Sequence, residues 1–313
     1  PGERLVWSKS YSVPTTVDRI HDTQLQITSG IANSLGSENG ISPDLIVARN
    51  ARKSKPNLAG FLCFISTYQY SVSPTRTEHL RLRDCLEDAV AAFPDFGEAW
   101  AALGVLYMDE VRFGRNQRPG RDSWADAKDA INKSLELAPL RNAPLMAGLV
   151  LSVQAPVQDL DRARQLGRKL MELFPRHPAT LALIGSLMAE FYGRWSEGLD
   201  LATQAIALEN APPSAFYITP AFYAAMQVDD AAALAATVPL TTLTSETELL
   251  LKYLAAARSG NTDMMSEQRA LLAQKELPSD ADLLRFVKNR RFHEKLETSL
   301  VSQLEAAFQI GSD

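Results

Sequence analysis

The sequence predicts an all-α protein built from repeated helix pairs, and three observations carry that prediction. From Pro56 to Asp313 apolar residues recur at helical spacing, with almost none of the alternation that marks strands. Short turns containing Pro or Asn separate the helical stretches. Equivalent turn positions then recur along the chain, which is the signature of an internal repeat. These positions are Pro94, Pro139, Pro175 and Asn210.

The first 55 residues have a different pattern. The segment from Arg4 to Tyr11 is rich in aromatic and β-branched residues and is followed by Pro14, which predicts an edge strand. A lone strand is unstable, so we expect it to be the last strand of a domain that lies upstream. Thr15 to Leu35 has apolar residues at helical steps and precedes Gly36, which predicts an amphipathic connector helix. A small basic run of Arg49, Arg52, Lys53 and Lys55 closes the region. We favour a solvated helix face as its interpretation and keep anion binding as the alternative.

The turn positions lie 45, 36 and 35 residues apart. The last two intervals are close to a repeat of about 34 residues. The first interval, from Pro94 to Pro139, is longer, and its additional residues fall in the loop from Arg112 to Asp122, which contains four arginines. Insertions in repeat proteins can serve binding, but arginines in a flexible loop are more often solvated. We favour the solvated interpretation and keep partner binding as the alternative.

The clearest stretch, FPDFGEAWAALGVLY, places Pro94 before Trp100, Leu103, Gly104 and Tyr107. This pattern resembles the tetratricopeptide repeat, which has an aromatic, a Leu-Gly pair and a Tyr on its first helix and a closing Pro. The resemblance implies a right-handed superhelix of helix pairs, an α-solenoid with a concave groove along the first helices. It also implies small or apolar residues where the second helix meets the first. Those positions are Leu82, Leu86, Ala89, Ala127, Ile131, Ser134, Ala163, Gly167, Leu170, Ala202 and Ala205. Later first helices are expected near Leu145, Leu181 and Phe216.

The end of the chain has its own pattern. Leu296, Leu300, Leu304 and Phe308 recur every four residues, with charged and polar residues on the other faces. This predicts a polar-backed helix that caps the repeats.

The order of these pieces also resembles the junction between a TolB-like domain and C-terminal repeats. The resemblance rests on Leu5-Val6-Trp7-Ser8, on the pattern from Ile20 to Leu35, and on Pro56-Asn57-Leu58-Ala59. Such regions occur in some bacterial class III adenylate cyclases and some winged-helix transcriptional regulators. The resemblance implies three regions. Residues 1–55 would be the end of the upstream TolB-like domain, residues 56–277 the repeats, and residues 278–313 would contain a capping helix.

Several kinds of chemistry lack sequence support. The chain is 46% hydrophobic with a formal net charge of −5, which argues against a nucleic-acid or anionic-membrane binder. The basic segment from Arg285 to Phe292 is therefore interpreted as a solvated helix face. No run approaches the roughly 18 apolar residues of a membrane span. The four histidines are dispersed, and phosphate-binding loops and nucleophile elbows are missing. We expect a soluble domain, cytoplasmic or periplasmic, that is not an enzyme and holds neither metal nor cofactor.

The two cysteines, Cys63 and Cys85, are too few for a disulfide framework. We favour the interpretation that they are two small buried hydrophobic residues. They fall on helices expected to be antiparallel neighbours, so a single disulfide in an oxidising compartment stays open.

The tetratricopeptide resemblance implies a protein-interaction module. Its groove positions fall on Glu98, Val105, Asp109, Met146, Gln154 and Glu190. This mixture of apolar and acidic residues favours a partner segment with some positive charge. The alternative is a dimerisation or scaffold region, a homodimer included, that controls an upstream adenylate cyclase or DNA-binding domain.

Overall fold

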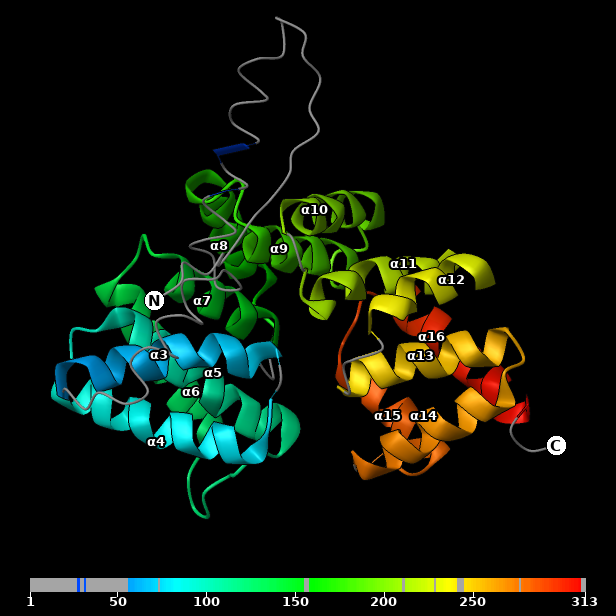
Figure 1. Cartoon of the computed structure of the whole chain (residues 1–313), viewed down its shortest axis with the longest axis horizontal. Helices are drawn as coiled ribbons and strands as arrows, with labels where there is room; N and C mark the ends of the chain where they lie inside the picture. The colour runs from blue at the N-terminus through cyan, green and yellow to red at the C-terminus, as the bar shows by residue number, and fades with distance from the viewer. Residues whose placement is uncertain are drawn as a thin grey trace, which may run out of the picture. The chain divides into compact units, whose positions relative to one another are not determined.

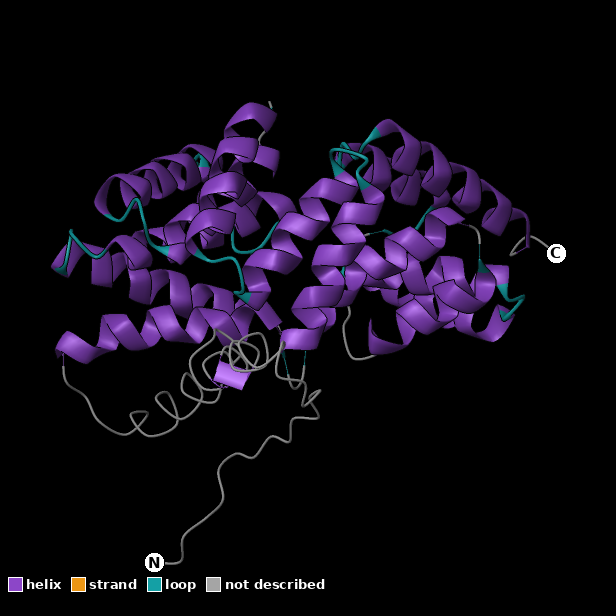
Figure 2. Ribbon diagram, turned by 90° about the horizontal axis from the view of Figure 1, so that it is seen from above, coloured by secondary structure: helices purple, strands orange, loops and turns teal. Residues whose placement is uncertain are grey.

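The computed structural model describes residues 27–28, 31, 56–72, 74–154, 158–209, 212–227, 229–240, 245–275 and 277–310. In these ranges all regular secondary structure is helical (Figure 2), which confirms the all-α prediction. The strand expected at 4–11 and the basic run that ends at Lys55 lie outside the described residues. Of the expected connector helix, Ile27, Thr28 and Ile31 are described, and all three are helical.

The chain forms two compact units. The first comprises Pro1–Thr180 with Leu208–Ala211, and the second comprises Leu181–Ala207 with Pro212–Asp313. The boundary between Thr180 and Leu181 falls inside a helix. The sequence predicted boundaries after residues 55 and 277 instead.

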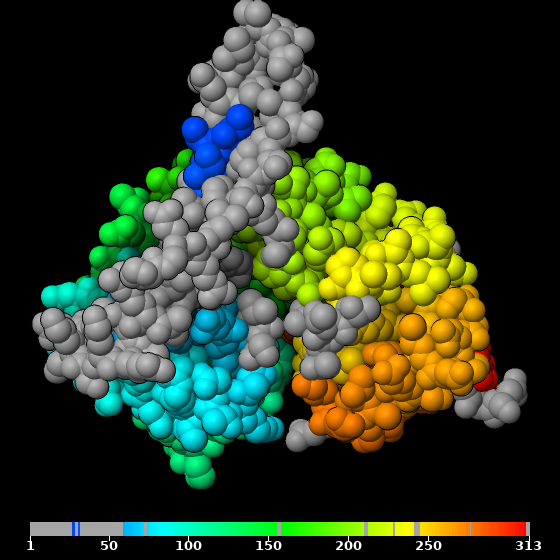
Figure 3. Space-filling model, viewed as in Figure 1, coloured from blue at the N-terminus to red at the C-terminus, as the bar shows by residue number. Residues whose placement is uncertain are grey.

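The first unit is a series of helix pairs (Figure 1). Its helices are α3 (Pro56–Val72), α4 (Arg76–Ala92), α5 (Gly97–Phe113), α6 (Ser123–Leu137), α7 (Asn142–Gln154) and α8 (Leu160–Leu173). Helix α3 packs against α4, α5 against α6, and α7 against α8. Helix α5 also packs against both α3 and α7, so the first helices of the pairs form one layer. On the face seen in Figure 3, α4 (cyan) forms part of the surface of this unit.

Three equivalent turns connect these pairs to the helices that follow. Phe93, Ala138 and Phe174 each precede a proline and have left the α conformation, with φ of −132°, −138° and −133° and ψ of 76°, 59° and 53°. A residue before proline avoids the α conformation, and the helix therefore stops there. The N–H of each donates to the carbonyl four residues earlier, at 2.8, 2.9 and 2.7 Å. The turns predicted from Pro94, Pro139 and Pro175 are thus confirmed, whereas Asn210 lies outside the described residues.

Glycines allow each first helix to approach its second helix closely. A Cβ on Gly104 of α5 would lie 2.5 Å from Ile131 Cγ1 of α6. One on Gly148 of α7 would lie 3.2 Å from Leu166 Cδ1 of α8, and 2.8 Å from Leu135 Cδ1 of the preceding α6. Gly185 faces a backbone carbonyl at 2.7 Å between α9 (Pro178–Glu190) and α10 (Trp195–Leu208). These glycines are 44 and 37 residues apart, nearly the spacing of the turns. The second-helix positions predicted to pack inward are all buried except Gly167, which is half-buried.

The second unit has a separate core. Besides α10 and most of α9, it contains α11 (Ile218–Gln227), α12 (Asp230–Thr237), α13 (Glu246–Arg258), α14 (Thr262–Gln274), α15 (Asp280–Asn289) and α16 (Glu294–Ile310), with 3-10 helices η2 (Ser214–Tyr217) and η3 (Val238–Leu240). Leu296, Leu300 and Leu304 of α16 are fully buried, and Phe308 packs against the same core, which confirms the predicted periodicity. In the basic segment of α15, Arg285 is exposed and pairs with Asp282.

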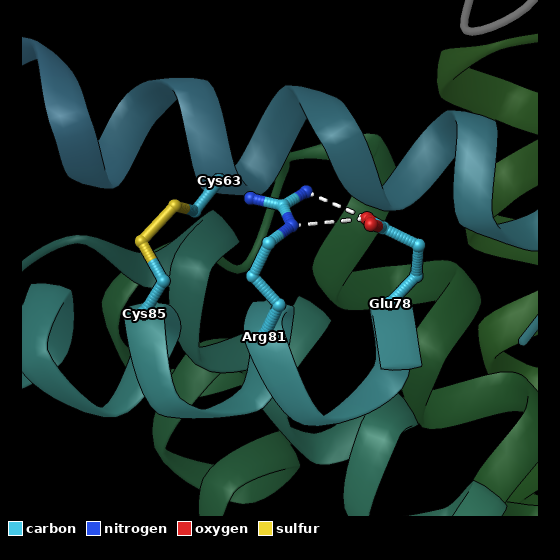
Figure 4. The surroundings of a disulfide bond; sticks show 4 residues. All are labelled: Cys63, Glu78, Arg81 and Cys85. Carbon is cyan, nitrogen blue, oxygen red and sulfur yellow. Dashed lines mark hydrogen bonds and ion pairs between the residues drawn. A yellow bond between two sulfur atoms is a disulfide. The ribbon is translucent and has the colours of Figure 1, made fainter. Parts of the chain in front are cut away.

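A disulfide joins the first helix pair. Cys63 of α3 and Cys85 of α4 are bonded, with Cα atoms 6.3 Å apart (Figure 4). A surface ion pair between Arg81 and Glu78 lies beside it on α4. The favoured interpretation of two unbonded cysteines was therefore wrong, because the helix packing brings the two side chains within bonding distance.

Candidate interaction surface

The predicted groove residues come from three first helices. Glu98, Val105 and Asp109 lie on α5, and Met146 and Gln154 lie on α7. Because α5 and α7 pack side by side, these five residues share one layer of the first unit. The sixth predicted residue, Glu190, belongs to the second unit.

The acidic members of this set already have partners within the fold. Asp109 has a side chain only 9% exposed that pairs with Arg115 at 3.5 Å and Arg112 at 3.8 Å. It also accepts a hydrogen bond from the hydroxyl of Tyr70 at 2.9 Å. Burial and the Asp109 carboxylate raise the pKa of Tyr70, so the phenol remains a donor. The charge of Asp109 is therefore balanced internally.

The other two carboxylates differ in how accessible they are. Glu190 is buried and accepts a hydrogen bond from Ser186 Oγ at 2.5 Å. Glu98 pairs with Arg141 at 3.5 Å, and the Arg141 side chain is 73% exposed. Surface ion pairs of this kind contribute about 0–1 kcal/mol, so Glu98 can exchange its partner.

The remaining predicted residues are half-buried. Val105 packs against the core of the first unit, and Met146 Sδ receives a weak hydrogen bond from Thr180 at 4.0 Å. Gln154 ends α7 and is also half-buried. The surface that these residues offer is more apolar and less acidic than the sequence suggested.

The arginine-rich loop between α5 and α6 is fastened to the helices around it. Arg118 binds both carboxylate oxygens of Glu87, at 2.6 and 2.8 Å, and Asp84 at 3.1 Å. Arg121 pairs with Asp126 at 2.8 Å. Arg115 of the loop and Arg112, in the last turn of α5, both pair with Asp109, so all four arginines of the segment 112–122 are in ion pairs. The expectation that they are merely solvated is therefore wrong.

A buried polar network lies beneath this loop. Arg83 of α4 donates to Glu110 of α5 at 2.7 Å and to the backbone carbonyl of Asn116 at 2.8 Å. Ser123, at the start of α6, donates to the other Glu110 oxygen at 2.5 Å. The network therefore ties α4, α5, the loop and α6 together. The sequence reasoning did not find it, since spacing along the chain does not reveal which charges become buried together.

Among the described residues, no group of three or more His, Cys, Asp or Glu is placed to hold a metal ion. In the same part of the chain, no helix is both long and apolar enough to cross a membrane. The fold and this surface define an all-helical protein with recurring helix pairs. No protein family matches the chain, and a search of curated proteins found no match either.

Proposed function

We propose that the helix pairs form a right-handed superhelix of the tetratricopeptide type, which binds a segment of another protein along its first helices. We propose further that this region is a regulatory module of a bacterial signalling protein and has no catalytic activity of its own. The packing of α3, α5 and α7 into one layer carries the proposal, since a continuous layer of first helices is the surface such modules use. The three equivalent turns and the recurring glycine contacts support it.

The chemistry of the surface favours a partner segment that is anchored by apolar side chains. Val105 and Met146 provide half-buried apolar contacts, while Asp109 is neutralised by arginines within the fold. Glu98 is the predicted acidic position whose ion partner is largely exposed. We therefore propose that a cationic residue of the partner, where present, contacts Glu98.

A displayed library of random peptides, selected against the protein, tests this proposal. Selected peptides are then measured by titration calorimetry against Val105→Glu and Met146→Glu. We expect each substitution to weaken binding by about tenfold or more, because a buried apolar contact is replaced by a desolvated charge. Lys128→Glu is the matched control, since Lys128 is exposed on the second helix α6. If neither Val105→Glu nor Met146→Glu changes the affinity, the proposal that peptides bind at this surface is wrong.

Glu98→Lys tests the electrostatic part separately. We expect Glu98→Lys to weaken the binding of cationic peptides and to leave the binding of uncharged peptides unchanged. Asp109→Lys is a poor probe, because it would place a third cation beside Arg112 and Arg115 in a buried position. Light scattering on the same samples separates peptide binding from the alternative in which this surface forms a homodimer.

A further inference from the structure

His79 of α4 is fully buried and is held from two sides. Its Nε2 lies 3.0 Å from the backbone carbonyl of Leu106 in α5. Its Nδ1 lies 3.2 Å from the side-chain amide nitrogen of Asn116 in the loop between α5 and α6. A carbonyl accepts and an amide NH₂ donates. The ring is therefore neutral, with its proton on Nε2 and its lone pair on Nδ1.

Asn116 fastens the loop to α4. Its amide nitrogen also donates to the carbonyl of Arg76 at 2.7 Å, and its own backbone carbonyl accepts from Arg83 at 2.8 Å. Its φ of 50° lies in the left-handed region, which asparagine tolerates better than most residues. Arg76 in turn donates to the carbonyl of Gly114 at 2.9 Å. The start of the loop is thus held through Asn116 and its neighbours.

The groups around the imidazole come from three helices. They are Tyr70 of α3, whose ring centre lies 6.0 Å away, Arg83 of α4, and Asp109 and Glu110 of α5. Burial lowers the pKa of His79 and Arg83 adds to this, against the opposing effect of the Leu106 carbonyl and the two carboxylates. The neutral ring is therefore the form that the folded protein favours.

Protonation of His79 would place an N–H on Nδ1, directly facing the NH₂ of Asn116. Rotating the Asn116 amide would present its oxygen to the ring but would set that oxygen against the carbonyl of Arg76. The first arrangement sets two donors against each other in a part-buried contact, and the second sets two acceptors against each other in an exposed one. Either is less favourable than the present pairing, by up to about 1–3 kcal/mol for the part-buried contact. We propose that His79 and Asn116 form a pH-sensitive latch, which holds the start of the loop, residues 114–117, at neutral pH and releases it when the imidazole is protonated.

The proposal can be tested on the unmodified protein. NMR with ¹⁵N-labelled histidine reports the charge of His79, and hydrogen exchange, corrected for its intrinsic dependence on pH, reports opening of residues 114–117. We expect the opening equilibrium to rise as the pH falls below about 6.5, by at most about tenfold for each pH unit, because the opened histidine regains its ordinary pKa. Opening should follow the charging of His79. A loop that stays protected while His79 becomes charged would overturn the latch.

Variants identify the groups responsible. His79→Gln retains a neutral donor and acceptor, so we expect a closed loop without dependence on pH. Asn116→Gly removes the amide but suits the positive φ, and it should open the loop at neutral pH. His177→Gln is the matched control, since His177 is another histidine of the first unit whose pKa burial lowers. Acid opening that persists in His79→Gln would also overturn the proposal.

Discussion

Arg83 of α4 and Glu110 of α5 form an ion pair at 2.7 Å whose side chains are only 4% and 3% exposed. Each group has a further hydrogen bond, from Arg83 to the Asn116 carbonyl and from Ser123 to Glu110. The ion pair joins the second helix of one helix pair to the first helix of the next, so the junction between these helix pairs depends on buried charge as well as on apolar contact.

Removal of one partner should be strongly destabilising. Glu110→Ala leaves the buried Arg83 guanidinium with only the largely exposed carboxylate of Asp84, at 3.3 Å, as its counter-charge. We expect a loss of about 3–5 kcal/mol in the free energy of unfolding, measured in urea. Glu136→Ala is the control, because its pair with Lys133 is largely exposed and should contribute at most about 1 kcal/mol. Equal losses in the two variants would contradict this account.

The disulfide should stabilise the first helix pair. Cys63 and Cys85 are 22 residues apart, and closing a loop of that length stabilises the folded state by about 3 kcal/mol through loss of chain entropy in the unfolded state. We expect reductant to lower the melting temperature of the parent and to have no effect on the double variant Cys63→Ala, Cys85→Ala. Thiol titration of the oxidised, denatured parent should find no free thiol.

Two glycine substitutions should act in opposite directions. Gly104→Ala would force a Cβ to within 2.5 Å of Ile131, so we expect a loss of about 1–3 kcal/mol. Gly167→Ala has no atom within 4 Å of the added Cβ and lies inside α8. It should therefore stabilise the protein by about 0.5–1 kcal/mol, through better helix propensity. Thermal unfolding of both variants checks the sign of each effect.

Glu87 should contribute to stability at neutral pH and not in acid. Burial by itself would raise its pKa, but hydrogen bonds from Arg118 and Tyr107 outweigh burial and hold the pKa below 4.5. The folded state therefore binds this proton less readily than the unfolded state. The contribution is present above about pH 4.5 and is lost as the pH falls through the folded value.

The variant Glu87→Gln isolates this effect. The stability difference between the parent and Glu87→Gln should shrink between pH 5 and pH 3, measured by urea unfolding at each pH. A difference that stays constant over this range would show that Glu87 does not titrate in the manner described.

The positions of the helices could be predicted because local rules decide them. A residue before proline leaves the α conformation whatever its tertiary surroundings, so Pro94, Pro139 and Pro175 mark real turns. Gly104 was recognised from its Leu-Gly pair. Gly148 and Gly185 make the same kind of contact but lack that neighbour, and their spacing was the signal that could have revealed them. The candidate surface was harder to predict, since the burial of Asp109 depends on arginines from the loop.

The sequence by itself determined the all-helical fold, the turns at Pro94, Pro139 and Pro175 and the buried face of α16, because hydrophobic periodicity and turn residues act over a few neighbours. The tertiary structure alone decided that Cys63 bonds Cys85 and that the four arginines of the segment 112–122 are in ion pairs. It also decided that the ring nitrogens of His79 contact the Leu106 carbonyl and the Asn116 amide. The cysteines are 22 residues apart in sequence, His79 and Leu106 are 27 apart, and His79 and Asn116 are 37 apart. Contacts over such separations depend on how helices pack, which residue type and spacing do not specify.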